Sequence, residues 1–247
     1  MPVVLRDAWA TLVPDMDGPD GPLPPLLLAL TVLTGLVDAF SYLLLGHVFV
    51  ANMTGNVVFM GFALAGAPGF SVLASSVALV SFVAGAWSGG IAVHQARTHR
   101  GRQLRHALLV ETACVTAALT VSTVSGGPYT GGVRFALIAL LALGLGAQNA
   151  AVRALAVPDL TTTVLTRTIT GTVADSRLAR GPGSRAGRRG LSAAAMLAGA
   201  VAGATAVLDG RRELPLLLAL VILLGAVAAT ALLGRGDAPW TRPPVKT

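Results

Sequence analysis

The chain has 247 residues, of which 54% are hydrophobic and 12% are charged, and its mean hydropathy is +0.73. This composition is too apolar for a soluble domain of this length and indicates a protein that resides in a lipid bilayer. The formal net charge is +7, but the basic residues stand mainly in short connections between apolar runs. That placement suits membrane orientation and argues against a nucleic-acid partner.

Residues 1–23 form a polar tail ahead of the first apolar run. Aspartates stand where a secretory signal would carry basic residues, so the tail is not interpreted as a signal. Leu5, Trp9 and Leu12 would share one face of a helix. Two interpretations of the tail stay open: a short interfacial helix, or a segment without regular structure.

Eight apolar stretches follow along the chain. They occupy residues 24–45, 48–66, 70–93, 107–124, 134–154, 160–174, 191–208 and 214–233. A helix needs about 20 largely apolar residues to cross a bilayer, and the second and sixth stretches fit this requirement worst because they are the most polar. The sequence therefore predicts an all-α integral membrane bundle of about six transmembrane helices, with two short interrupted or re-entrant segments.

The distribution of Lys and Arg supports this count. If residues 48–66 and 160–174 enter the membrane and return, thirteen basic residues share the side of both termini, and only Arg134, Arg211 and Arg212 face the other side. A seven-span variant, in which residues 48–66 cross, scores twelve to four and stays open. On the six-span count we expect both termini to face the cytoplasm.

The two halves of the chain share a pattern. The run Met53-Thr54-Gly55-Asn56-Val57 precedes a similar run at 165–169 by 112 residues, and a Gly-x-x-x-Gly pair at 85–89 precedes another by 114. We therefore expect an inverted three-plus-three repeat, which in secondary transporters places the binding site at mid-membrane. The predicted parts are a membrane domain at 24–235 with halves 24–124 and 134–233, and a C-terminal tail at 236–247.

Asp38 is the strongest single candidate for function. It lies within the first span, where inserting a charge costs about 2.5 to 3.5 kcal/mol, so its side chain should face a partner or a polar path. Two interpretations stay open. Asp38 either holds a proton or a cation, or it forms a structural pair with Arg153 or Arg167 or a hydrogen bond to a neighbouring helix.

The other candidate residues are polar groups in the interrupted segments and in the fifth apolar stretch. They are Asn52, Thr54, Gly55, Asn56, Gln148, Asn149, Arg153, Thr163, Thr166 and Arg167. Their amides and hydroxyls would either coordinate a small polar solute or satisfy the backbone where a helix is interrupted. The arginines among them would favour an anionic solute.

No sequence pattern points to an enzyme, a resident cofactor or a metal. Phosphate-binding loops, paired catalytic carboxylates and His/Cys ligand spacings are absent from the sequence. His94, His99 and His106 are too loosely spaced for a convincing metal centre. Glu111, near the start of the fourth stretch, is interpreted together with His106 as an ordinary interfacial residue.

The combined motifs of the first half resemble a known family. Residues 35–39 (GLVDA) and 46–56 (GHVFVANMTGN) closely resemble the signature of the YoaK-like bacterial membrane proteins, with support from 146–150 (GAQNA) and 161–166 (TTTVLT). The resemblance covers about residues 24–235. It implies a polytopic protein of about six helices in bacterial cytoplasmic membranes, and it supplies no established substrate. The family has Thr-Gly where this chain has Thr166-Arg167, which adds a positive charge.

The functional hypothesis is a transporter or permease for a small polar or ionic solute, with proton coupling through Asp38. The alternative is a non-transporting structural or regulatory membrane protein whose polar residues only hold helices together. Expected partners are the lipid bilayer and a small polar solute, and a homodimer is compatible with so few helices. We expect no nucleic acid and no cofactor.

Overall fold

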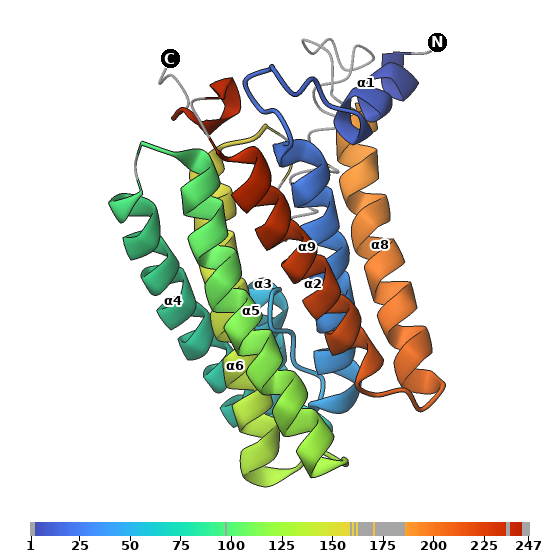
Figure 1. The fold of residues 1–247 in the computed structure, drawn as a ribbon. Coiled ribbons are helices and arrows are strands. Elements are labelled where there is room, and N and C mark those ends of the chain that lie inside the picture. The colour runs from blue at the N-terminus through green and yellow to red at the C-terminus, as the bar shows by residue number, and fades with distance from the viewer. Residues whose placement is uncertain are drawn as a thin grey trace.

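The computed structural model describes residues 3–96, 98–158, 160, 162, 170, 186–235 and 238–243, and every regular element in them is a helix. These helices are α1 (Val3–Leu12), α2 (Leu23–Leu44), α3 (Met53–Leu64), α4 (Val72–Gln95), α5 (Arg100–Ser125), α6 (Gly131–Leu155), α8 (Ala186–Leu208), α9 (Leu214–Leu233) and the 3₁₀ helix η2 (Pro239–Thr241). Among the described helices, α2, α4, α5, α6, α8 and α9 are long and apolar enough to cross a membrane, and they form one bundle (Figure 1). The predicted all-α membrane bundle with six spans is thereby confirmed.

α1, the first helix of the chain, and η2, the last, lie at the same end of the bundle, which we call the terminus end (Figure 1). There α1 lies across the start of α8, at Gly187, where a side chain would overlap the backbone of α1. The Arg188 N–H donates a hydrogen bond to the Asp7 carboxylate at 3.0 Å. Of the two interpretations of the N-terminal tail, the short helix is the one the structure contains, and its apolar Trp9 is 60% exposed.

The chain of the C-terminal tail also packs onto the terminus end. Trp240 in η2 is buried against Gly101 at the start of α5 and against Gly21. The Trp240 side chain of η2 thus covers part of the terminus end of the bundle.

α2 and α6 are the two central spans. In the most apolar part of each helix, 67% of the α2 residues and 61% of the α6 residues are buried, whereas 17% of those in α4 and 22% of those in α8 are buried. Since a helix that is apolar on all sides can face either protein or lipid, this difference separates the core spans from those with a broad lipid-facing surface. Apolar side chains on α4 such as Val80 and Trp87 are accordingly exposed.

Two close helix crossings join the spans, because α4 packs along α6 and α2 packs along α8. Each crossing has a glycine on both helices, at positions where a side chain would overlap backbone atoms of the other helix. The glycines and their backbone neighbours are Gly85 with Leu143, Gly146 with Phe82, Gly199 with Val32 and Gly35 with Met196. Such contacts let the backbones touch, which stabilises helix pairs in lipid by van der Waals packing.

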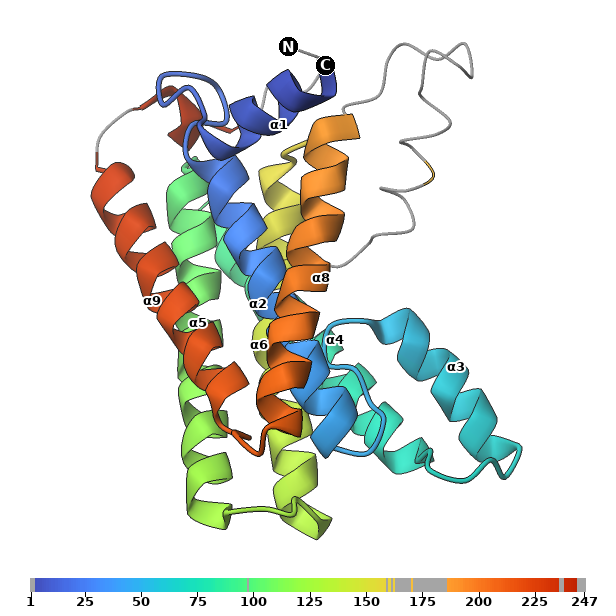
Figure 2. The same ribbon diagram turned by 90° about the vertical axis from the view of Figure 1, so that its right-hand side faces the viewer.

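The segment between α2 and α4 enters the bundle and returns. α2 ends and α4 begins at the same end, while residues 45–52 run back toward the middle and α3 leads out again (Figure 2). The twelve residues of α3 span only about 18 Å, too short to cross. The six-span arrangement therefore holds over the seven-span variant. The second predicted segment, 160–174, lies outside the described residues except for positions 160, 162 and 170.

Candidate functional site

Asp38 holds the inward-running chain of the re-entrant segment. It lies on α2, is 4% exposed, and its Oδ1 accepts hydrogen bonds from the N–H groups of Val50 at 3.1 Å and Ala51 at 3.0 Å. These two residues lie just before α3, in backbone that is not helical. The carboxylate thus satisfies two donors that have no partner in a helix, at a depth where water is scarce.

Asn56 binds the backbone of Phe49, the residue immediately before Val50 and Ala51. Its side chain is fully buried; its Oδ1 accepts a hydrogen bond from the Phe49 N–H at 2.9 Å and its Nδ2 donates to the Phe49 carbonyl at 2.6 Å. Asn56 lies in the first turn of α3, so α3 and the extended chain before it are joined by two hydrogen bonds. Together, Asp38 and Asn56 satisfy the N–H groups of three consecutive residues, 49–51.

Asn52 and Gly55 shape the start of α3. Asn52 is the N-cap residue, and its side-chain oxygen accepts a hydrogen bond from the Gly55 N–H at 3.4 Å. Gly55 leaves room for the Phe49 ring, which would lie 2.9 Å from a side-chain carbon at this position. Thr54 is exposed. These residues make the turn from extended chain into helix compact.

Aromatic rings pack around this turn. The Phe49 ring stacks on Tyr42 of α2 at 5.0 Å and on Phe59 of α3 at 5.6 Å, measured between ring centroids. Phe70, just before α4, lies 5.2 Å from Phe59. The rings join the end of α2, the re-entrant segment and the start of α4, so α3 is held mainly by its two ends and by the hydrogen bonds at 49–51.

The candidate residues of α6 do not share one environment. Gln148 is fully buried and faces Glu111 of α5; with its amide nitrogen turned toward the carboxylate, it donates at 2.9 and 2.7 Å to the two oxygens. Asn149 is half-buried and donates to the Leu145 carbonyl at 3.0 Å. Arg153 is exposed near the end of α6. No ion pair joins Arg153 to Asp38 among the described residues, and Oδ1 of Asp38 accepts backbone N–H groups instead.

Glu111 is a buried acid that the sequence interpretation placed at the membrane surface. It is 0% exposed and lies beside Gly144 of α6, whose missing side chain leaves room for it. The prediction failed because α5 begins at Arg100 rather than near residue 107, so Glu111 lies about 16 Å along the helix. His99 caps this start by accepting a hydrogen bond from the Arg102 N–H, and histidine is not one of the residues that usually mark the beginning of a helix in a sequence.

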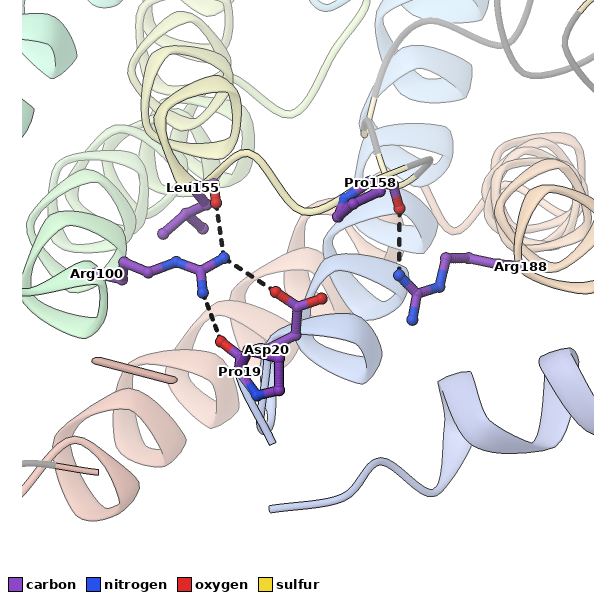
Figure 3. Close-up of polar contacts among 6 residues, drawn as sticks. All are labelled: Pro19, Asp20, Arg100, Leu155, Pro158 and Arg188. Carbon is purple, nitrogen blue, oxygen red and sulfur yellow. Dashed lines mark hydrogen bonds and ion pairs between the residues drawn. The ribbon is translucent and has the colours of Figure 1, made fainter. Parts of the chain in front are cut away.

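A second cluster of hydrogen bonds joins the loops of the terminus end. Arg100, 3% exposed, donates to the Pro19 carbonyl at 2.7 Å, to the Leu155 carbonyl at 2.7 Å and to the Asp20 carboxylate at 3.2 Å (Figure 3). We call this cluster the Arg100 clasp. It ties the chain before α2 to the start of α5 and the end of α6. The sequence indicated only that Arg100 belongs to a cytoplasmic loop.

Three predicted site residues, Thr163, Thr166 and Arg167, lie outside the described residues. Of the others, the structure brings together Asp38, Asn52, Gly55 and Asn56 and places Gln148 with Glu111. Of the two uses left open for these side chains, satisfaction of interrupted backbone is observed. Binding of a solute at the same residues stays a prediction.

Comparison with known proteins places this arrangement in a family. The family model described as "Protein of unknown function (DUF1275)" matches residues 26–231. The chain is similar to the UPF0700 transmembrane protein YoaK of Bacillus subtilis (strain 168), with 32% identity over 157 residues, which is 60% of this chain and 65% of that protein. No solved structure matches. The family and the transmembrane relative agree with the resemblance read from residues 35–56.

Proposed function

Because this chain belongs to the DUF1275 family, whose function is unknown, its activity has to follow from its structure, and we propose that it moves a small polar or ionic solute across the bacterial cytoplasmic membrane. The observation that carries the proposal is Asp38, a carboxylate that holds a re-entrant segment from within a span. A neutral amide would accept the same two N–H groups without the insertion cost of about 2.5 to 3.5 kcal/mol for a charge. An acid at this place is therefore best explained by a use for its charge or its proton.

Proton binding at Asp38 provides the coupling in this proposal. The ionised carboxylate is a stronger acceptor for the N–H groups of Val50 and Ala51 than the protonated acid, whose carbonyl oxygen is a weaker acceptor than an amide oxygen. The extended chain then separates more easily from α2, and α3, which packs chiefly on α4, moves with it. Since proton binding favours the released segment, release of the segment favours proton binding by the same free energy.

An inverted repeat is the second part of the proposal. The residues at the two glycine crossings correspond at nearly constant offsets: Val32 with Leu143 and Gly35 with Gly146 at 111, and Phe82 with Met196 and Gly85 with Gly199 at 114. The same helices of each half thus make the same type of contact, which supports two structurally related halves. Such repeats are common in secondary transporters, in which interrupted helices surround the substrate.

We further propose that the terminus end is cytoplasmic. The described basic residues Arg100, Arg102 and Arg105 lie there, whereas Arg134 and Arg212 lie near the opposite end, at the start of α6 and before α9. Positively charged residues collect in the short connections on the cytoplasmic side of the membrane. Cysteine labelling of residue 6 from outside intact cells would contradict this orientation.

The rival function, a non-transporting structural or regulatory protein, has one observation in its favour. Asp38 and Asn56 are buried, and their side chains are bonded to the backbone of residues 49–51. A purely structural brace would have the same contacts. The two functions differ in what the charge of Asp38 is for, and substitution of the charge alone distinguishes them.

The test compares Asp38→Asn with the wild-type chain and with Asp17→Asn, an exposed control. Purified protein is first screened by thermal shift against amino acids, sugars, organic acids and inorganic anions, and stabilising solutes are then followed into proteoliposomes with an imposed pH gradient. Because the amide introduced by Asp38→Asn can accept the same two N–H groups, we expect normal folding and a loss of gradient-driven uptake. Wild-type levels of uptake in Asp38→Asn would refute proton coupling. If no solute in the panel is bound or transported, the structural function replaces the proposal.

A further inference from the structure

A cavity of about 360 Å³ lies at the terminus end, between the first turns of α5 and the last turn of α9. The two helices pack against each other, and these ends are adjacent in the bundle (Figure 1). The cavity is lined by His99, Gly101, Arg102, Arg105, Thr230, Ala231, Gly234 and Arg235. Neither Asp38, in the second half of α2, nor the re-entrant segment lines it. The helix α3 of that segment lies toward the other end of the bundle (Figure 2).

The charged side chains that line this cavity in the described part of the chain have one sign. Arg102 and Arg105 come from the α5 wall and Arg235 from the α9 wall, and the eight lining residues include no carboxylate. Within the described part of the chain, none of these three guanidinium groups has a hydrogen-bond or ion-pair partner. Arg102 and Arg235 are exposed and Arg105 is half-buried, so water weakens the repulsion among these three charges, and an anion between them would offset what remains.

The position of Arg102 on its helix strengthens this point. It is the third residue of α5, and the helix dipole makes this end of the helix partly positive, so a cation there is unfavourable by itself. Arg100, the first residue, offsets this by its contacts to Asp20 and two carbonyls. The guanidinium group of Arg102 has no such contacts within the described residues. An anion in the cavity would make the electrostatic energy of this helix end favourable, since it would attract both the helix end and the arginines.

The neutral groups of the lining fit the same ligand. His99 Nδ1 accepts a hydrogen bond from the Arg102 backbone N–H at 3.2 Å, so in the neutral imidazole the proton lies on Nε2, which is then a donor. The Thr230 carbonyl at the end of α9 already accepts the Gly234 N–H at 3.2 Å, which reduces the negative character of that wall.

We propose that this cavity, which we call the arginine pocket, binds a phosphate group, carried either by a soluble phosphate ester or by the headgroup of a phospholipid. Guanidinium groups from two walls match a group with several equivalent oxygens and up to two negative charges. The volume lies within the range of small-ligand sites. The proposal is independent of transport and of Asp38.

The experiment measures binding to the purified full chain in detergent by native mass spectrometry and thermal shift. The soluble probes are inorganic phosphate and glycerol 3-phosphate. The lipid probes are short-chain phosphatidic acid and phosphatidylglycerol, with short-chain diacylglycerol as the probe that lacks phosphate. The pocket variant is Arg105→Gln with Arg235→Gln, and the matched control is Arg6→Gln with Arg242→Gln, which removes two exposed charges elsewhere at the terminus end.

We expect at least one phosphate-bearing probe to bind, with affinity about tenfold lower in the pocket variant and unchanged in the control. Binding of the soluble esters identifies a soluble ligand, and binding of the phospholipids alone identifies a headgroup; either result supports the pocket. Equal loss in both variants, equal binding of diacylglycerol, or no binding of any phosphate probe would overturn it. Should the pocket variant fail to fold, wild-type affinity must still fall several-fold as salt rises from about 50 to about 500 mM, and a salt-independent affinity would refute the proposal.

Discussion

The re-entrant segment and the Arg100 clasp meet the same physical problem with opposite charges. In both places the chain enters or leaves a helix and has backbone groups without a partner inside that helix. Asp38 accepts two N–H groups before α3, whereas Arg100 donates to the carbonyl oxygens of Pro19 and Leu155. A buried anion thus collects donors and a buried cation collects acceptors.

The two sites differ in depth and in how their charge is balanced. Arg100 begins α5 at the terminus end and has an acidic partner, Asp20, at 3.2 Å. Asp38 lies within a span, and its contacts in the described part of the chain are backbone N–H groups rather than a basic side chain. Arg100 keeps its charge and has an acidic partner, whereas Asp38, an acid without a basic partner among the described residues, can lose its charge by taking up a proton. We therefore expect the Arg100 clasp to stay rigid and the re-entrant segment held by Asp38 to change conformation.

The largest expected effect is that of Asp38→Ala. It leaves the N–H groups of Val50 and Ala51 without acceptors, each at about 1–3 kcal/mol, so we expect a loss of about 3 kcal/mol in the free energy of unfolding. The measurement is denaturant unfolding in mixed micelles. Asp38→Asn should keep most of this stability, because its side-chain oxygen can accept both bonds. If Asp38→Asn is as unstable as Asp38→Ala, the charge itself is structural and the comparison fails.

Arg100→Met should have the next largest effect. It removes three hydrogen bonds and leaves two carbonyl groups and the Asp20 carboxylate at a partly buried site, for an expected loss of about 2 kcal/mol. Thermal unfolding followed by circular dichroism measures it. Arg100→Lys should recover only part of the loss, since one ammonium group cannot reproduce the fork geometry. Full recovery by Lys would mean that charge alone, and not the three directed bonds, holds the clasp.

A smaller and more local effect is expected for Asn56→Ala. The substitution removes both side-chain hydrogen bonds to Phe49, and we expect a loss of about 1.5 kcal/mol. Hydrogen exchange should rise at residues 49–51 more than elsewhere in the bundle, because the bonds hold that extended chain. A uniform rise over all spans would show that the segment does not open as a separate unit, against the proposed release mechanism.

The smallest effect is expected for Asn52→Ala, which removes the cap of α3. Its hydrogen bond to Gly55 is long, at 3.4 Å, and Asn52 is exposed, so we expect no more than about 1 kcal/mol. The same unfolding measurement in micelles applies. A loss as large as that of Asp38→Ala would mean that the α3 cap, rather than Asp38 of α2, is the main contact that holds the re-entrant segment.

Much of the architecture followed from the amino-acid sequence. Stretches of about 20 apolar residues predict spans because the hydrocarbon core has a fixed thickness. The polar residues at 52–56 make residues 48–66 a poor span, but the sequence left the six-span and seven-span arrangements open. The sequence also placed Asp38, Asn52, Gly55 and Asn56 in one neighbourhood, since they lie close to one another along the chain. It could not tell whether these side chains bind a solute or the backbone.

Other features depended on the tertiary structure. Glu111 meets Gln148 across 37 positions, and Arg100 meets Leu155 across 55 and Pro19 across 81. Which groups meet depends on the residue at which α5 starts and on how closely α4 and α6 cross, and a shift of one residue turns a side chain by about 100° around its helix. Hydrophobicity and charge are properties of a segment and are summed along the chain, so the spans could be predicted. A hydrogen bond requires two particular atoms within about 3 Å, and only the packed bundle decides which atoms those are.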